Sequence, residues 1–255
     1  MSGTYKIPGK WLDHQVRVSI IGAGGTGSQI ADQLASLQTT LQMLGHPGFD
    51  VTVYDGDRVS SSNIGRQRFT RSDIGGYKAP LLVNRINQFY GLDWQAMPRY
   101  FDPARGGNGC DLLITAVDKA AFRAELGSRA SEAYREGLWL DMGNGESTGN
   151  VVLGHLTWPE GQSRLPNVFD LYPELANMQA VDDEAPSCST EEAISRQSWP
   201  VNRMAAMLAS EILWNLFRNG QITHHGAFFQ LNPMCVQNLP VDPNVWAMMG
   251  YQAAA

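Results

Sequence analysis

The first half of the chain alternates short apolar runs with longer amphipathic segments. The apolar runs predict strands at residues 16–21, 51–54, about 94–99, 111–117 and 138–141. The amphipathic segments between them predict helices at 28–37, 77–89 and 120–135. Regular alternation of strands and helices is typical of a mostly parallel sheet with helices on both faces. We therefore expect an α/β, Rossmann-like fold in this half.

The pattern changes after Asp141. Residues 151–157 predict another strand, and the polar, proline-interrupted stretch from Pro159 to about Pro200 is interpreted as a crossover loop. Pro200 suits the first turn of a helix. The apolar runs at 227–231 and 234–239 predict an antiparallel strand pair that closes the sheet.

Two of the helical segments carry apolar residues at helical spacing, which predicts a buried face on each. These residues are Leu82, Ile86 and Phe89 in the first segment and Met204, Leu208 and Ile212 in the second. With 43% hydrophobic residues, 255 residues can build one sizeable core. We expect a single domain of 1–255, made of a first half at 1–145, a strand and crossover loop at 146–200, and a helix and closing hairpin at 201–255.

Charge and composition exclude several classes of function. The net charge is −6 and no long basic run is present, which disfavours a nucleic-acid surface. No apolar stretch approaches the length of a membrane helix, and the first residues lack the apolar core of a signal peptide. We therefore expect a cytoplasmic protein that binds neither nucleic acid nor membranes.

The cysteines and histidines indicate no metal centre. Three cysteines lie far apart and form no CxxC pair, so we expect neither a disulfide framework nor a zinc site. Cys110 and Cys235 are interpreted as small core residues. The adjacent His224 and His225 face opposite ways on a strand, which favours hydrogen-bonded or solvated histidines over metal ligands.

A glycine-rich turn follows the first predicted strand in VRVSIIGAGGTG. Its candidate ligand-binding residues are Gly22, Gly24, Gly25, Thr26 and Gly27. A buried strand that enters a tight glycine turn and continues into a helix directs backbone N–H groups at the phosphates of a nucleotide. The motif alone is weak evidence, because glycines also serve plain turns.

Acidic residues follow two of the predicted strands. Asp55 ends the second strand, where a carboxylate bonds ribose hydroxyls, although it is also suited to a turn before Gly56. Asp57 is explained equally well by turn chemistry. Asp118 ends the apolar run LLITAVD, where it could hold Mg²⁺ against a triphosphate or cap the next helix. Position alone leaves these two roles equally supported.

Basic and amide side chains cluster in SSNIGRQRF. The segment contains Asn63, Arg66, Gln67 and Arg68, and Lys78 lies twelve residues after Arg66. Cations this close to a phosphate turn favour a triphosphate over a dinucleotide, since Arg offers a planar fork and Lys a compact charge to phosphate oxygens. A solvated charged loop is the alternative.

Taken together, these motifs resemble the E1-like activating enzymes of the ThiF/MoeB/HesA family. The resemblance rests on GAGGTGS, Asp55, SNIGRQ, the GxxKA motif at 75–79 and Asp118, and it covers roughly residues 15–120. The phrases DIGGYKAPLLVNRIN and FYGLDWQA are more particularly similar to the ThiF-family proteins of bacterial PRTRC gene systems.

The resemblance implies one E1-like adenylation domain with a nucleotide-binding half at 1–145. Such enzymes use ATP and Mg²⁺ to adenylate the C-terminal glycine of a ubiquitin-like or sulfur-carrier protein, and they form homodimers. It also implies that Asp55 binds ribose, that Asp118 holds magnesium, and that the phosphate ligands are Asn63, Arg66, Gln67 and Lys78.

Cys188 in APSCSTEEA lies in the predicted crossover loop, where family members place a cysteine that receives the activated carrier. A loop thiolate suits that role, and transfer onward to an E2-like partner could follow. The neighbouring acidic residues disfavour thiolate formation, so an inert thiol is the alternative.

The chain departs from the family pattern in three ways. It has no clear arginine-bearing N-terminal segment, no zinc-binding CxxC pairs, and Asp118–Lys119 where Asp-Asn is common. Three other functions would account for only part of this pattern. An NAD-dependent oxidoreductase leaves Arg66 and Lys78 unexplained, and a non-catalytic nucleotide-binding scaffold has no use for the full polar set. ATP-dependent tRNA dehydration is disfavoured by the acidic balance.

Overall fold

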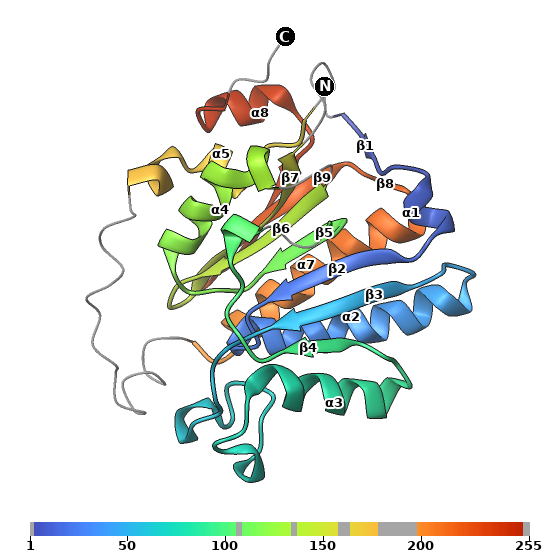
Figure 1. Cartoon of the computed structure of the whole chain (residues 1–255). Helices are drawn as coiled ribbons and strands as arrows, with labels where there is room; N and C mark the ends of the chain where they lie inside the picture. Colours follow the sequence, from blue (N-terminus) through green and yellow to red (C-terminus); the bar gives the residue numbers. More distant parts are fainter. Residues whose placement is uncertain (1–2, 106–108, 134–136, 158–163, 178–197, 252–255) are drawn as a thin grey trace.

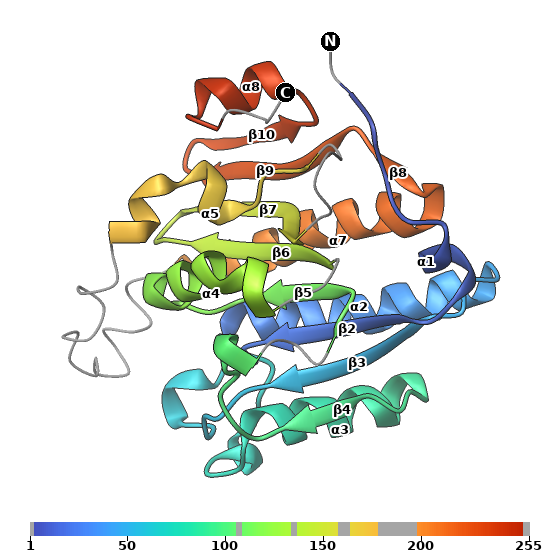
Figure 2. The same ribbon diagram turned by 45° about the horizontal axis from the view of Figure 1, so that its top comes forward.

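The computed structural model describes residues 3–105, 109–133, 137–157, 164–177 and 198–251. An eight-stranded sheet with the order β10-β9-β7-β6-β5-β2-β3-β4 runs through the middle of the molecule (Figure 1), and Figure 2 shows the strands in this order with β10 labelled. A second sheet pairs only β1 (Tyr5–Lys6) with β8 (Gln221–Ile222). The main sheet divides into a parallel and an antiparallel half.

The parallel half contains five strands. They are β2 (Val16–Ile21), β3 (Phe49–Tyr54), β4 (Gln95–Met97), β5 (Leu112–Thr115) and β6 (Gly137–Asn144). Each pairs in parallel with its neighbours in the order β4-β3-β2-β5-β6. The chain turns from β2 to β3 on one side and reaches β5 on the other. The carboxyl ends of β2 and β5 therefore flank the switch point at which ligands bind in such sheets.

The antiparallel half contains β7 (Thr148–Thr157), β9 (His224–Leu231) and β10 (Met234–Pro240). The hairpin between β9 and β10 crosses the cis Asn232–Pro233 bond. β10 is the edge strand, and its first five residues are exposed on both faces.

Two layers of helices cover the sheet (Figure 2). One face carries α2 (Gly25–Met43), α3 (Lys78–Tyr90) and α7 (Val201–Asn219), which share a core with the apolar residues of that face. The other carries α4 (Ala120–Ala133), α5 (Val168–Leu171) and α8 (Pro243–Met248). The remaining short elements are α1 (Lys10–Asp13) and the 3₁₀ turns η1 (Ser61–Asn63), η2 (Arg71–Asp73), η3 (Pro103–Arg105) and η4 (Pro173–Asn177).

The predicted fold class is confirmed: a mostly parallel sheet with helices on both faces and a closing antiparallel strand pair. The helix predicted at 28–37 spans Gly25–Met43, and the strand predicted at 94–99 shortens to Gln95–Met97. The short elements β1, α1, α5, β8 and α8 were not expected. None of the described helices is long and apolar enough to cross a membrane.

Two predicted core positions, Phe89 and Cys235, are wrong. Phe89 is 80% exposed, because Tyr90 and not Phe89 continues the face of α3 that packs against the core. Cys235 is exposed, because the edge strand β10 has no layer over either side at that point.

Met204 and Leu208 are partly buried and pack against the core, and Ile212 is buried in it, so the predicted apolar face of α7 is confirmed. Small residues of the same helix, among them Ala205 and Ala209, are fully buried.

Cys110 lies in the core as expected, and burial raises its thiol pKa to about 11. His225 is buried, with Nδ1 2.6 Å from the Leu153 carbonyl oxygen, and His224 Nε2 lies 2.9 Å from Glu211. Over the described part of the chain, no three His, Cys, Asp or Glu residues gather in a group that could hold a metal ion.

Candidate active site at the carboxyl edge of the sheet

The glycine turn connects β2 to α2 in a geometry that side chains forbid. Gly22 has φ +95°, and a Cβ placed on it would lie 2.7 Å from the Ala116 carbonyl oxygen. A Cβ on Gly27 would lie 2.0 Å from the Gly22 carbonyl oxygen. The N-cap residue of α2, Gly24, offers no side-chain cap. The first N–H groups of a long helix are therefore left for a ligand, and they favour an anion.

Asp55 braces this turn from the end of β3. One carboxylate oxygen accepts the Ala23 N–H at 2.6 Å and the other accepts the Asp57 N–H at 2.8 Å. Burial raises the pKa of Asp55, and these two N–H groups act to lower it. The side chain is 8% exposed. Asp55 therefore lies at the end of the second predicted strand as expected, and it also holds the glycine turn in place, a role that the sequence did not reveal.

Lys78 and Asp57 form an ion pair at the start of α3. Lys78 Nζ lies 2.8 Å from Asp57 Oδ2, and Lys78 is buried. The Tyr100 hydroxyl donates to Asp57 Oδ1 at 2.6 Å. Burial acts to raise the pKa of Asp57, but the hydrogen bonds from Lys78 and Tyr100 hold it below its usual value. Asp57 thus holds the lysine ammonium at the rim.

The loop between β3 and α3 packs against the first turns of α2. Arg68 pairs with Asp32 at 3.0 Å, and its N–H donates to Ser28 Oγ at 3.3 Å. The Gln67 amide nitrogen lies 3.9 Å from the position of a Cβ on Gly24. Gln67 Oε1 is buried with no hydrogen-bond partner among the described residues. The loop therefore brings Gln67 over the glycine turn.

Asn63 and Arg66 lie in the same loop. The Asn63 carbonyl oxygen accepts the Gln67 N–H at 2.9 Å, and its side-chain oxygen accepts the Ser60 N–H at 2.9 Å. That side chain closes a capping box on η1, a role that sequence reasoning missed. Arg66 is half-buried next to Gln67.

Asp118 follows β5 on the other side of the glycine turn. The preceding residues touch the turn: the Ala116 N–H donates to the Ile21 carbonyl at 2.9 Å, and a Cβ on Gly22 would lie 3.6 Å from Val117. Asp118 itself is exposed. One exposed carboxylate beside an open phosphate site fits Mg²⁺, which binds through one or two carboxylates and keeps phosphate and water ligands.

Thr26 points away from the glycine turn toward β6 and α7. Its hydroxyl donates to Asn202 Oδ1 at 2.9 Å and accepts from Asn144 Nδ2 at 2.7 Å. A Cβ on Gly25 would lie 2.7 Å from the Asn202 amide nitrogen. Sequence reasoning missed both asparagines. Their positions could have indicated them: Asn144 ends β6, and Asn202 lies in the first turn of the helix that follows Pro200.

A buried ion pair supports the carboxyl ends of β5 and β6. Arg123 Nε donates to both oxygens of Asp141 at 2.9 Å, and its Nη2 donates to the carbonyls of Val117 and Met142. Thr115 Oγ1 also donates to Asp141, at 2.5 Å. Arg123 and Asp141 line a cavity of about 470 Å³ that also includes Asn144. This network, which was not predicted, extends the polar rim from the glycine turn toward β7.

The structure thus gathers most of the predicted residues at one edge. The glycine turn, Asp55, Asp57, Gln67, Lys78 and Asp118 all follow the carboxyl ends of β2, β3 and β5 or the loops packed on them. Thr26 and Asn63 are present with their side-chain oxygens directed elsewhere. Cys188 lies outside the described residues, as does most of the predicted crossover loop.

Comparison with solved structures finds the same fold in PaaA and MccB, among other proteins. PaaA shares 18% identity at a TM-score of 0.62, over 89% of this chain and 64% of PaaA. MccB from E. coli, in a structure with ATP, shares 13% identity at a TM-score of 0.64, over 91% of this chain and 65% of MccB. A structure of MccB with selenomethionine MccA shares 15% identity at a TM-score of 0.60, over 92% and 66% of the two chains.

The chain therefore spans about two thirds of the length of these proteins. No curated protein sequence matches it. A model of the ThiF family matches residues 11–244, which include the glycine turn, the β3–α3 loop and the last strands of the sheet. The chain belongs to the ThiF family.

Proposed function

We propose that this chain is an E1-like adenylyltransferase that uses Mg·ATP to activate a carboxylate of a peptide or carrier protein. The observation that carries the proposal is the carboxyl edge itself. An uncapped helix N-terminus, the buried Lys78 and the exposed Asp118 surround one glycine turn. Family membership supports it, and so do the neighbours, since MccB has been solved with ATP and with MccA.

In the proposed reaction, a carboxylate oxygen of the substrate attacks the α-phosphorus of ATP. A bond forms between them, the bond from this phosphorus to the bridging oxygen breaks, and pyrophosphate leaves with the electron pair. The N–H groups of the glycine turn, Arg66 and Lys78 bind phosphate oxygens, and Asp55 binds the ribose. Magnesium held at Asp118 would supply further positive charge to these oxygens. Fixed cations at such positions lower the barrier as negative charge develops.

We further propose that the substrate is the C-terminal glycine of a ubiquitin-like or sulfur-carrier protein, as in the family that the motifs resemble. Cys188 could then take the acyl group as a thioester with release of AMP, before transfer to an E2-like partner. A homodimer, a PRTRC-type gene context and a cytoplasmic location remain predictions from the sequence.

Pyrophosphate exchange tests the first step. Labelled pyrophosphate should enter ATP when the chain, Mg²⁺, ATP and a small protein ending in glycine are combined. We expect Asp118→Ala to lower the exchange rate about 10²–10³-fold, since it removes the metal-binding carboxylate. The matched control is Asp93→Ala, an exposed aspartate between α3 and β4 at the other edge of the sheet. Normal exchange in a folded Asp118→Ala protein would show that the magnesium assignment is wrong.

A titration separates this proposal from an NAD-dependent oxidoreductase. Mg·ATP should raise the thermal unfolding temperature of the wild-type chain, because a ligand that binds only the folded state stabilises it. NAD⁺ should raise this temperature much less, because it has no γ-phosphate for Lys78 to bind. Stabilisation by NAD⁺ alone would reverse the assignment.

A further inference from the structure

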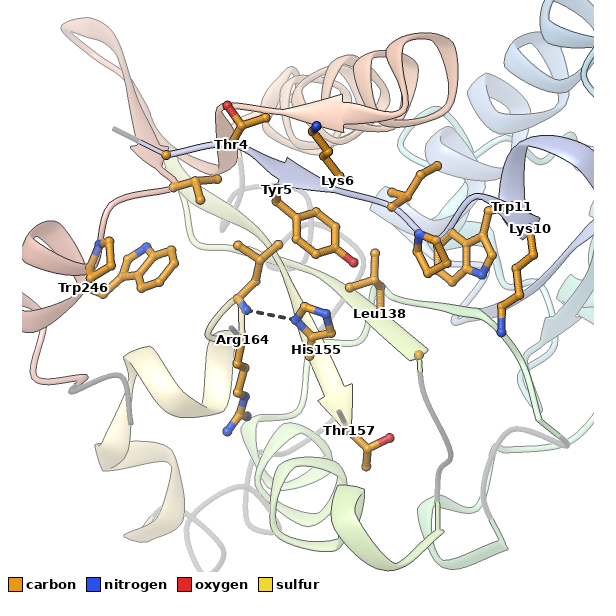
Figure 3. Close-up of a pocket in the computed structure, with 17 residues that line it drawn as sticks. Thr4, Tyr5, Lys6, Lys10, Trp11, Leu138, His155, Thr157, Arg164 and Trp246 are labelled. Carbon is orange, nitrogen blue, oxygen red and sulfur yellow. Dashed lines mark hydrogen bonds between the residues drawn. The ribbon is translucent and has the colours of Figure 1, made fainter. Parts of the chain in front are cut away.

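A cavity of about 740 Å³ opens at the amino edge of the sheet, at the ends of the strands opposite the glycine turn. It is lined by the N-terminal segment, the start of β6, the end of β7, the residues before α5 and the start of α8 (Figure 3). Its volume lies in the range of small-molecule sites. None of the residues assigned to adenylation lines it.

Apolar core residues form part of the wall of this amino-edge cavity. Ile7, Trp11, Leu138, Leu165, Val241 and Trp246 line it. All six are buried and belong to the two cores that flank the sheet. The cavity therefore has a floor of packed core residues, and these six side chains can accept an apolar body at little cost in reorganisation.

Two polar side chains present hydrogen-bond donors to the cavity. Tyr5 and His155 lie edge to face, with ring centroids 5.3 Å apart (Figure 3). Burial lowers the pKa of His155 to about 4, so the ring is neutral near pH 7. Its Nδ1 accepts the Leu165 N–H at 2.9 Å, which leaves the proton on Nε2. Neither Nε2 nor the Tyr5 hydroxyl has a hydrogen-bond partner among the described residues.

The charged residues that line the cavity are all basic. Lys6, Lys10 and Arg164 line it, and the described lining residues include no Asp or Glu, although acidic residues outnumber basic ones 25 to 19 in the chain. Arg164 also pairs with Asp170, which lies outside the lining. A lining with hydrogen-bond donors and basic residues but, among its described members, no acidic residue complements an anion. Half-buried donors such as the Tyr5 hydroxyl and His155 Nε2 are costly unless a ligand or water satisfies them.

We propose that the amino-edge cavity binds a small molecule with an apolar body and a terminal carboxylate. The apolar side chains take the body, and the Tyr5 hydroxyl and His155 Nε2 donate to the carboxylate. This binding site is separate from the proposed adenylation site and does not depend on it.

Calorimetric titration of the full chain with decanoate, well below its micelle-forming concentration, tests the proposal. The neutral isostere decanamide has the same apolar body and no charge. We expect one decanoate per chain and at least about tenfold weaker binding of decanamide. Equal binding of the two probes, or no decanoate binding, would overturn the proposal.

Two variants locate the binding. Tyr5→Phe removes one donor and keeps the ring, and His155→Phe removes the other. Each should weaken decanoate binding about tenfold, the size expected for one hydrogen bond to a charged group. The control Arg71→Gln changes an exposed cation in η2, outside the cavity, and should bind as the wild type does.

Thermal unfolding establishes that each variant is folded. Unchanged decanoate binding in both folded variants would refute the assigned site. If either variant fails to fold, the decanoate–decanamide comparison in the wild-type chain still decides whether charge is recognised. Pyrophosphate exchange reports on the other edge, so a failure here is distinguishable from a failure of the proposed adenylation.

Discussion

The carboxyl and amino edges of the sheet differ in how they hold polar groups. At the carboxyl edge, charges meet partners: Lys78 pairs with Asp57, and Asp55 accepts two backbone N–H groups. At the amino edge, Tyr5 and His155 present donors to a cavity with apolar core residues in its wall and no described carboxylate. The carboxyl edge is suited to a highly charged ligand that replaces the present partners of these charged groups. The amino edge is suited to an apolar ligand with one charged end.

The difference follows from the topology. Helix N-termini meet the carboxyl ends of parallel strands, so glycines and acids there can organise phosphate binding within a short stretch of chain. The amino-edge cavity instead forms where residues near 5, 138, 155, 164 and 246 converge from distant parts of the chain. Variants that act on one edge and spare the other can test whether the two are independent.

The largest effect is expected from Gly27→Ala at the carboxyl edge. The new methyl would lie 2.0 Å from the Gly22 carbonyl oxygen, so the backbone of the turn must shift. We expect a loss of about 4 kcal/mol in the free energy of unfolding and no measurable binding of Mg·ATP. Urea unfolding and ATP titration measure the two effects.

The matched control for this variant is Gly9→Ala near the amino edge. Gly9 has φ −54° and no atom within 4 Å of an added Cβ. Its unfolding free energy should change by less than about 1 kcal/mol, with ATP binding intact. If Gly27→Ala behaved like this control, the turn would not have the tight geometry described above.

A second prediction concerns acid, and it acts on the amino edge. Burial lowers the pKa of His155 to about 4, below the ordinary value of 6.5. The unfolded chain therefore binds the proton more readily than the folded chain, and stability falls as the pH drops through 6.5 toward 4. A shift of this size contributes a loss of about 3 kcal/mol between pH 7 and pH 4.

Urea unfolding at a series of pH values measures this contribution. In His155→Gln the decrease in the free energy of unfolding between pH 7 and pH 4 should be about 3 kcal/mol smaller than in the wild type. The control His14→Gln removes an exposed histidine and should leave the fall unchanged. Asp57, at the carboxyl edge, has a lowered pKa. The stability that its ionised carboxylate contributes is therefore lost only as the pH falls below the ordinary pKa of 3.8. Equal pH dependence in both variants would contradict the buried, neutral state of His155.

The two edges also differ in how far the sequence predicts them. Gly22 and Asp55 could be assigned because the turn and the strand end are local features, and parallel topology brings strand ends to one edge. The contacts of Thr26 with Asn144 and Asn202 could not, since they span 118 and 176 residues. Tyr5 and His155 were equally hidden, because nothing in either segment indicates that they meet.

Periodicity predicted the elements better than their burial. Phe89 continues the helical spacing of Leu82 and Ile86, yet it is 80% exposed because Tyr90 takes the core-facing position in that turn. Cys235 sits in a correctly predicted strand whose outer position leaves it uncovered. A repeating pattern defines a face of an element, while burial also depends on what packs against that face.

The smallest effect is expected from Tyr100→Phe, which tests how the charges of the carboxyl edge are tuned. Tyr100 is 74% exposed, and its hydroxyl donates to Asp57 at 2.6 Å. Phenylalanine keeps the ring, which lies 3.1 Å from the position of a Cβ on Gly56, and loses only this bond. The stability of the fold should change little, because an exposed ring contributes little to the core.

The effect on the nucleotide should be larger than the effect on the fold. Without the Tyr100 hydroxyl, the pKa of Asp57 rises, because the carboxylate has lost one of its two hydrogen-bond donors. The carboxylate then binds the Lys78 ammonium more tightly, which leaves the lysine less available to phosphate. The KM for Mg·ATP in pyrophosphate exchange should then rise about three- to tenfold, equivalent to about 1 kcal/mol. The control Tyr77→Phe changes a tyrosine that stacks on Arg58 and makes no hydroxyl hydrogen bond with the described residues. If both variants gave the same KM, Tyr100 would have no part in holding Asp57, and the lysine would be positioned by burial alone.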